Sequence, residues 1–186
     1  MSSGYSTQND EILNHVLKFY NKDNRLQEML NIINGESRIS LRIVDWFSTN
    51  YAKKFFTVYP IEKHGTTIRF KVYQDYKLRL KAYSKKRFDP FCRWDRINVP
   101  YKDGSYIQTT IGQLNFFKWA IENKVIDYIN DNYTAIENDM NSRNSTSRKK
   151  EQTVNNNKTR KKREELSVSA VKTIKKENVE IVVKFD

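Results

Sequence analysis

The sequence predicts an α+β protein, with one mainly helical domain that carries one or two small antiparallel β-hairpins, followed by a basic linker and a C-terminal strand. Three observations predict this class. Apolar residues recur at three- and four-residue spacings in residues 9–140, two strand-like runs flank turn-forming residues, and the chain becomes polar and basic after residue 140. The elements do not alternate regularly between strand and helix, which argues against a parallel sheet.

Three helices are predicted within the first 52 residues, over 9–21, 24–34 and 40–52. Ile12, Val16 and Tyr20 follow a helical spacing in the first of them. Gly35 follows the second helix at the position where a left-handed residue commonly ends one.

Two hairpins are predicted further along the chain. Residues 55–59, closed by Pro60, are expected to pair with residues 66–71 across a turn near His64 and Gly65. Residues 96–109 are expected to form the second hairpin, around the turn Lys102-Asp103-Gly104.

Residues 72–83 fit two periodicities. Tyr76, Leu78 and Leu80 alternate as in a strand, whereas Tyr73, Tyr76 and Leu80 follow a helical spacing. The long, straight-chain side chains of this run favour the helix, with the strand as the alternative. A turn is predicted next, at 89–90, where proline restricts the residue before it.

Thr109 or Thr110 is expected to cap a further helix, which Asn123 interrupts before a second one that reaches about residue 140. Such a tight pair resembles a DNA-reading helix–turn–helix. Residues 97–140 carry three basic and six acidic side chains, however, so we interpret the pair as packing elements.

The predicted domain organisation has three parts. Residues 1–140 form the globular domain, and residues 141–164 form a disordered basic linker, because Val154 is the only aliphatic residue there. Residues 165–186 form a strand or hairpin, which either closes the domain's own sheet or adds to the sheet edge of a partner.

The composition excludes several kinds of site. One cysteine and two histidines are too few for a structural zinc site, and the five glycines form no phosphate-binding loop. We find no catalytic constellation, so we expect a non-enzymatic protein without metal or cofactor. The single cysteine, Cys92, is expected to be an inert, half-buried thiol.

The same features predict a compartment. A lone cysteine allows no internal disulfide, which fits a reducing environment. The N-terminus lacks the pattern of a signal peptide, and no apolar run is long enough to span a bilayer. We therefore expect an intracellular, soluble protein.

The net charge of +12 is concentrated in two segments, of which the first is 53–96, with thirteen Lys or Arg against four Asp or Glu. Cations that are interleaved with aromatic rings suit a polyanion with stackable bases. The alternative is that the rings belong to the core and the cations solvate the opposite face. The candidate nucleic-acid-binding residues here are Lys77, Lys81, Lys85, Lys86, Arg87, Arg93, Trp94 and Arg96.

Two further expectations concern their neighbours. Tyr83, Phe88 and Phe91 join Trp94 as candidate stacking platforms. Asp89 and Asp95 are expected to orient the arginines of the same segment as ion-pair partners rather than to hold a cation.

The second basic segment is the tail. Its clusters are typical of arms that bind nucleic acid or acidic partners, or that direct nuclear import, with a solubilising linker as the alternative. The candidate binding residues in it are Lys149, Lys150, Arg160, Lys161, Lys162 and Arg163.

Three strings resemble an uncharacterised protein group of large nucleocytoplasmic DNA viruses, the giant viruses. They are SLRIVDWFSTNYAKK (40–54), YKLRLKAYSKKRFDPFCRWDRI (76–97) and TTIGQLNFFKWAIENKVIDYI (109–129), and residues 159–185 are also similar to that group. The resemblance carries no functional residue over. It implies a setting in a cytoplasmic viral factory, the nucleus or the virion, where genome packaging, late transcription and capsid assembly take place.

Two function hypotheses follow. The first is a non-enzymatic nucleic-acid-binding protein that contacts the phosphates of DNA or RNA through the basic aromatic segment and the tail. The second is a structural or assembly protein of the virion that binds viral structural or transcription proteins through its C-terminal strand and basic arm.

Overall fold

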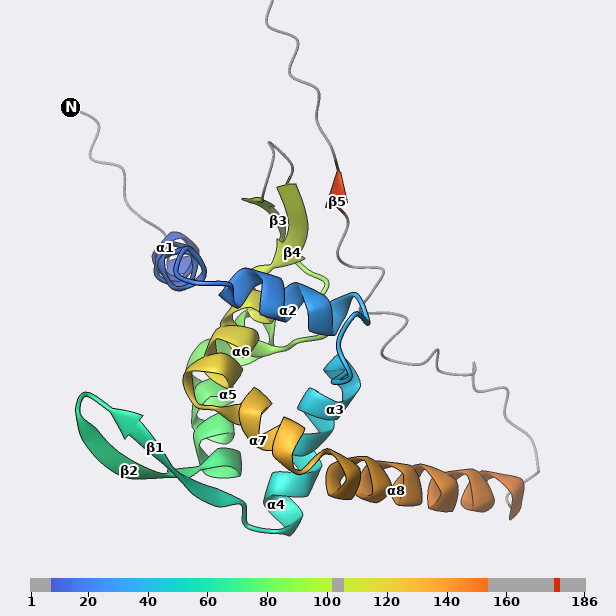
Figure 1. The fold of residues 1–186 in the computed structure, drawn as a ribbon. Coiled ribbons are helices and arrows are strands. Elements are labelled where there is room, and N and C mark those ends of the chain that lie inside the picture. The colour runs from blue at the N-terminus through green and yellow to red at the C-terminus, as the bar shows by residue number, and fades with distance from the viewer. Residues whose placement is uncertain (1–7, 102–105, 154–175, 178–186) are drawn as a thin grey trace, which may run out of the picture.

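The computed structural model describes residues 8–101, 106–153 and 176–177 (Figure 1). Two antiparallel hairpins lie among the helices: β1 (Val58–Lys63) with β2 (Thr66–Lys71), and β3 (Arg96–Pro100) with β4 (Tyr106–Thr110). The helices are α1 (Gln8–Tyr20), α2 (Arg25–Ile33), α3 (Leu41–Trp46), the π-helical turn η1 (Phe47–Tyr51), α4 (Ala52–Lys54), α5 (Val72–Phe88), α6 (Ile111–Glu122), α7 (Val125–Asp131) and α8 (Tyr133–Thr153). The predicted mainly helical α+β class is confirmed.

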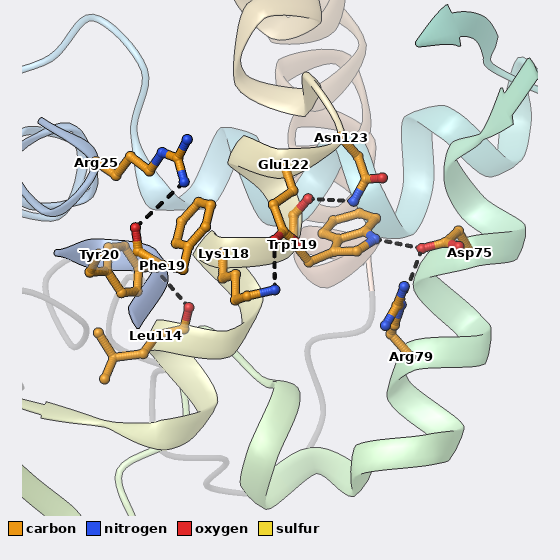
Figure 2. Close-up of polar contacts among 10 residues, drawn as sticks. All are labelled: Phe19, Tyr20, Arg25, Asp75, Arg79, Leu114, Lys118, Trp119, Glu122 and Asn123. Atoms are coloured by element: carbon orange, nitrogen blue, oxygen red, sulfur yellow. Dashed lines mark hydrogen bonds and ion pairs between the residues drawn. The ribbon is translucent and has the colours of Figure 1, made fainter. Parts of the chain in front are cut away.

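Helix α6 lies at the centre of the molecule and packs against α1, α5, α7 and β4. Thr110 caps it by accepting a hydrogen bond from the amide of Gln113, as predicted. Figure 2 shows how it is tied to its neighbours. The Tyr20 hydroxyl of α1 donates to the carbonyl of Leu114 at 2.8 Å, and the Trp119 indole N–H donates to Asp75 of α5 at 2.7 Å.

A four-ring cluster joins α5 to α6. It consists of Tyr76 and Phe88 from α5 and of Phe116 and Trp119 from α6, and all six pairs of ring centroids lie 5.7–6.4 Å apart. Phe88 and Phe116 are completely buried. Edge-to-face and tilted ring pairs of this kind add to the stabilisation that burial alone provides.

The helix predicted over 40–52 is present, but it widens into the π-turn η1. Ser40 is its N-cap and accepts a hydrogen bond from the amide of Ile43. The hydroxyls of Ser48 and Thr49 donate to the carbonyls of Val44 and Asp45 at 2.9 and 2.7 Å. These bonds compete with the regular helical ladder, which gives a reason for the wider turn.

The strand predicted over 55–59 is placed wrongly. Phe56 has φ of +48°, and the amide of Thr57 donates to the carbonyl of Ala52, so residues 55–57 end the helix instead. Strand β1 begins at Val58 and contains Pro60. A two-stranded sheet leaves one side of each strand unpaired, so proline needs no ladder partner there.

The first hairpin turn and the helix after it agree with the sequence. His64 and Gly65 both have positive φ, as a two-residue turn requires. Residues 72–83 are helical rather than extended, and α5 continues to Phe88 across a break at Ser84 (φ 63°, ψ 168°).

Helix α8 continues past residue 140, where the linker was predicted to begin, and runs outward from the body as far as Thr153 (Figure 1). The buried residues Ile136 and Met140 anchor the first part of α8, and a helix that is already nucleated adds one hydrogen bond per residue without a core of its own. The rest of the predicted linker, 154–164, lies outside the described residues. Asp139 fixes the first half of α8 by accepting hydrogen bonds from Trp46, at 3.1 Å, and Lys54.

A two-residue strand, β5 (Lys176–Glu177), pairs antiparallel with β4 of the same chain and completes a sheet of order β3-β4-β5. The segment near the C-terminus therefore adds to the domain's own sheet at this point. The strand predicted at 179–185 lies outside the described residues.

We predict that Gly112→Ala destabilises the fold. A Cβ at position 112 would lie 3.0 Å from the carbonyl oxygens of Lys86 and Asp89 and from the Cβ of Cys92. Two of these three atoms belong to the backbone, so relief requires the 86–92 segment to move away from α6. We expect the free energy of unfolding, measured with denaturant, to fall by about 1–2 kcal/mol, in the range of overpacked cores. An unchanged unfolding midpoint would contradict the close approach.

Candidate nucleic-acid interface

The lysine pair of α5 lies on an exposed helix face. Lys77 and Lys81 are one turn apart, and Leu78 between them is 66% exposed. The Lys53 ammonium lies 5.7 Å from the centre of the Tyr73 ring, which extends the positive charge toward α4. A shallow groove of about 720 Å³ runs along this face, lined by Tyr73, Gln74, Lys77, Leu78, Leu80 and Lys81.

The break at Ser84 separates this face from the cations that follow. Lys85 and Lys86 are exposed, whereas Arg87 is held against the first turn of α1. Its guanidinium donates to the side-chain oxygens of Asn9 and Gln8, both at 2.7 Å. Arg87 therefore also fixes α1, a role that the sequence did not predict.

A second cleft, of about 140 Å³, brings three of the predicted residues together. It is lined by Asn9, Lys86, Arg87, Trp94, Asp95 and Ile111. Trp94 is 71% exposed at this cleft. We call this group the Trp94 cleft.

The segment that carries Trp94 is fixed by polar side chains of α6 and its cap. The Thr110 hydroxyl donates to the carbonyl of Cys92, and the Gln113 amide donates to that of Pro90, at 3.4 and 3.0 Å. Asn115 donates to the carbonyl of Arg87 at 2.9 Å. The sequence did not predict this support. The sequence pattern that could have indicated it is the pair of polar residues Gln113 and Asn115 within an otherwise apolar helix.

The turn at 89–90 is present, but its carboxylate acts differently from the prediction. Asp89 accepts a hydrogen bond from the amide of Phe91 at 2.8 Å, which closes the turn. Within the described part of the chain, neither Asp89 nor Asp95 forms an ion pair with an arginine. The expected pairing is therefore wrong, because the Asp89 carboxylate is used by the local backbone.

The remaining predicted cations are spread over neighbouring segments. Arg93 is exposed, and Arg96 at the start of β3 donates to Gln108 at 3.2 Å. Lys149 and Lys150 lie in the last turns of α8. Arg160, Lys161, Lys162 and Arg163 lie outside the described residues.

Most of the predicted stacking rings belong to the core. Phe88 is in the four-ring cluster, and Tyr83 stacks on it with centroids 6.1 Å apart and planes 23° apart. Phe91 is half-buried against the same core. Trp94 alone among the four predicted platforms has an exposed ring. Cys92 is buried, and its thiol donates to the carbonyl of Lys86 at 3.4 Å.

The positive charge of residues 53–96 is largely unneutralised. Among the described residues, only two of its thirteen cations form ion pairs, Lys54 with Asp139 and Arg79 with Asp75. The second of these pairs is shown in Figure 2. The other cations keep their attraction for an external polyanion.

The same described residues contain no cluster of three or more metal-ligating side chains. None of their helices is both long and apolar enough to cross a bilayer.

Residues 2–182 match a family of unknown function (DUF7197). The chain belongs to this family. It is also 42% identical over 166 residues to an uncharacterized protein of Acanthamoeba polyphaga mimivirus. That match covers 82% of this chain and 64% of the relative, so the chain spans less than two thirds of the relative's length. The mimivirus relative supports the predicted resemblance to giant-virus proteins. No solved structure matches the chain.

One carboxyl group of this family member has an unusual proton affinity. Asp45 of α3 is partly buried, and burial, with a smaller contribution from the negative charge of Asp89, raises its pKa to about 7. Asp89 is the residue that closes the turn before Trp94. Ionisation of Asp45 therefore places a second negative charge near that turn.

We predict that Asp45→Asn removes a pH dependence of stability. Because the folded-state pKa lies above the unfolded value near 3.8, the folded state binds more protons, and stability falls as pH rises from about 4 to 7. The difference in unfolding free energy between variant and wild type should therefore change across this window and level off above it. The control is Asp131→Asn, at an exposed carboxylate. Parallel pH profiles for wild type and Asp45→Asn would contradict the assignment.

Proposed function

We propose that this protein binds nucleic acid without catalysing a reaction on it. The observation that carries the proposal is the set of unneutralised cations around an exposed tryptophan at the Trp94 cleft. Lysine ammonium groups act as point charges on phosphates, and an exposed ring offers a surface for a base. Lys77 and Lys81 on α5 add a second positive face, and the tail adds the cations at 160–163.

The proposed binding implies where in the infected cell the protein acts. In an infected cell, this binding would take place where the viral genome is copied or transcribed, in a cytoplasmic viral factory or the nucleus. A packaged copy would meet the genome in the virion.

We predict that Lys85→Glu/Lys86→Glu weakens binding roughly ten-fold or more at moderate salt, because it reverses two exposed cations beside the cleft. Arg87 is left intact because it also holds α1. The measurement is the dissociation constant of full-length protein for labelled DNA and RNA, over a series of salt concentrations. Wild-type affinity should fall steeply with salt, with a shallower slope for the variant.

The matched control is Arg69→Glu/Lys71→Glu, which changes the net charge equally. Arg69 and Lys71 are exposed on β2, which leads into the start of α5. Lys85 and Lys86 are exposed near the opposite end of α5. If the two double variants lose the same affinity, only overall charge matters and the interface lies elsewhere. Salt-independent binding, or none to either polymer, would overturn the proposal.

A protein partner is a second candidate function, favoured by the groove on α5. Leu78 is exposed there between Lys77 and Lys81, an arrangement that suits an acidic, amphipathic segment of a virion protein. Leu78→Ser should then reduce co-purification of capsid or core proteins and leave the affinity for nucleic acid unchanged.

A further inference from the structure

Trp94 differs from the other two tryptophans of the chain. Trp46 and Trp119 each direct the indole N–H to a carboxylate, Asp139 and Asp75, at 3.1 and 2.7 Å. Trp119 is also 3% exposed, whereas Trp94 is 71% exposed and has no such bond within the described structure. Exposure of a large apolar ring to water is unfavourable, and exposed rings of this kind are characteristic of binding surfaces.

The cleft around Trp94 offers three different contacts. Its ring is a flat surface for stacking, and Lys86 supplies a cation for a phosphate. Asp95 supplies a carboxylate, which repels phosphate but accepts hydrogen bonds from the amino group of a base. A nucleotide would make all three contacts if its phosphate lay beside Lys86 and its base lay against Trp94 and Asp95.

The segment that leads to Trp94 is also held in place before any ligand arrives. The hydrogen bonds from Thr110, Gln113 and Asn115 fix the backbone of the 87–92 segment, and Gly112 allows this segment to lie directly on α6. Phe88 anchors the same segment in the four-ring cluster. Preorganisation of this kind lowers the entropy lost on binding.

Base stacking is what distinguishes paired from unpaired bases at this cleft. The cleft, of about 140 Å³, has room for one small group such as a single base. Within a duplex, both faces of each internal base are stacked on its neighbours, so the ring of Trp94 has no free face to contact.

We propose that the Trp94 cleft binds an unpaired nucleobase, so that the protein prefers single-stranded nucleic acid to duplex. Trp94 stacks on the base, Lys86 contacts the adjacent phosphate and Asp95 accepts from an amino group of the base. This inference rests on the proposed nucleic-acid-binding function and adds the class of substrate to it.

The experiment uses full-length protein with three probes of one mixed sequence: a short single-stranded DNA, the equivalent RNA and a blunt-ended duplex without a loop. Trp94→Ala should weaken binding of the preferred single strand roughly ten-fold, within the range for loss of one stacked base, and Trp94→Phe should retain most of the affinity. Duplex binding should change little in either variant. The DNA and RNA arms show which polymer the site accepts.

Fluorescence provides a second readout, because Trp94 is the most exposed of the three tryptophans. Single-stranded probe should quench the intrinsic emission of wild type but not of Trp94→Phe. The inference is overturned if Trp94→Ala binds single strands like wild type, or loses single-strand and duplex affinity equally. In either case, salt-dependent binding that needs Lys85 and Lys86 would leave the proposed function standing. Absence of binding to every probe would overturn both.

Discussion

The packing of α5 against α6 through four aromatic rings is the interaction on which the rest of the structure depends. Phe116 and Trp119 are fixed by the nearly complete burial of α6, and they determine where Tyr76 and Phe88 lie. Because Phe88 is at the last residue of α5, the cluster fixes both the helix and the point at which the chain leaves it. Tyr20 and Asp75 then connect α1 and α5 to the same central helix.

The candidate interface follows from this constraint. Once Phe88 is buried, the chain from Asp89 onward must cross the N-terminal end of α6, where Gly112 allows a close approach. Polar side chains at that end bond to the backbone of the crossing segment, while the side chains of Lys86, Arg93 and Trp94 on either side of it are exposed. The result is an exposed cation and an exposed indole on a fixed backbone, which a solvated loop could not provide.

Sequence reasoning identified most elements because their local signals agree with their burial. The capped helix after Thr110 and the two-residue turn at His64 and Gly65 are examples. It misplaced the strand at 55–59, because Phe55 and Phe56 have high strand propensity but end a helix in the fold. It placed the domain boundary at residue 140, because loss of apolar residues signals loss of a core but not the end of a helix.

The sequence by itself determined the excess of positive charge in 53–96 and the mainly helical class. Tertiary structure alone decided which aromatic residues are available. The sequence does not distinguish the four candidate rings, Tyr83, Phe88, Phe91 and Trp94. In the fold, the α5–α6 contact buries Phe88 completely, whereas Trp94 is 71% exposed. The reason is that burial depends on contacts between segments distant in sequence, whereas charge and periodicity belong to each segment itself.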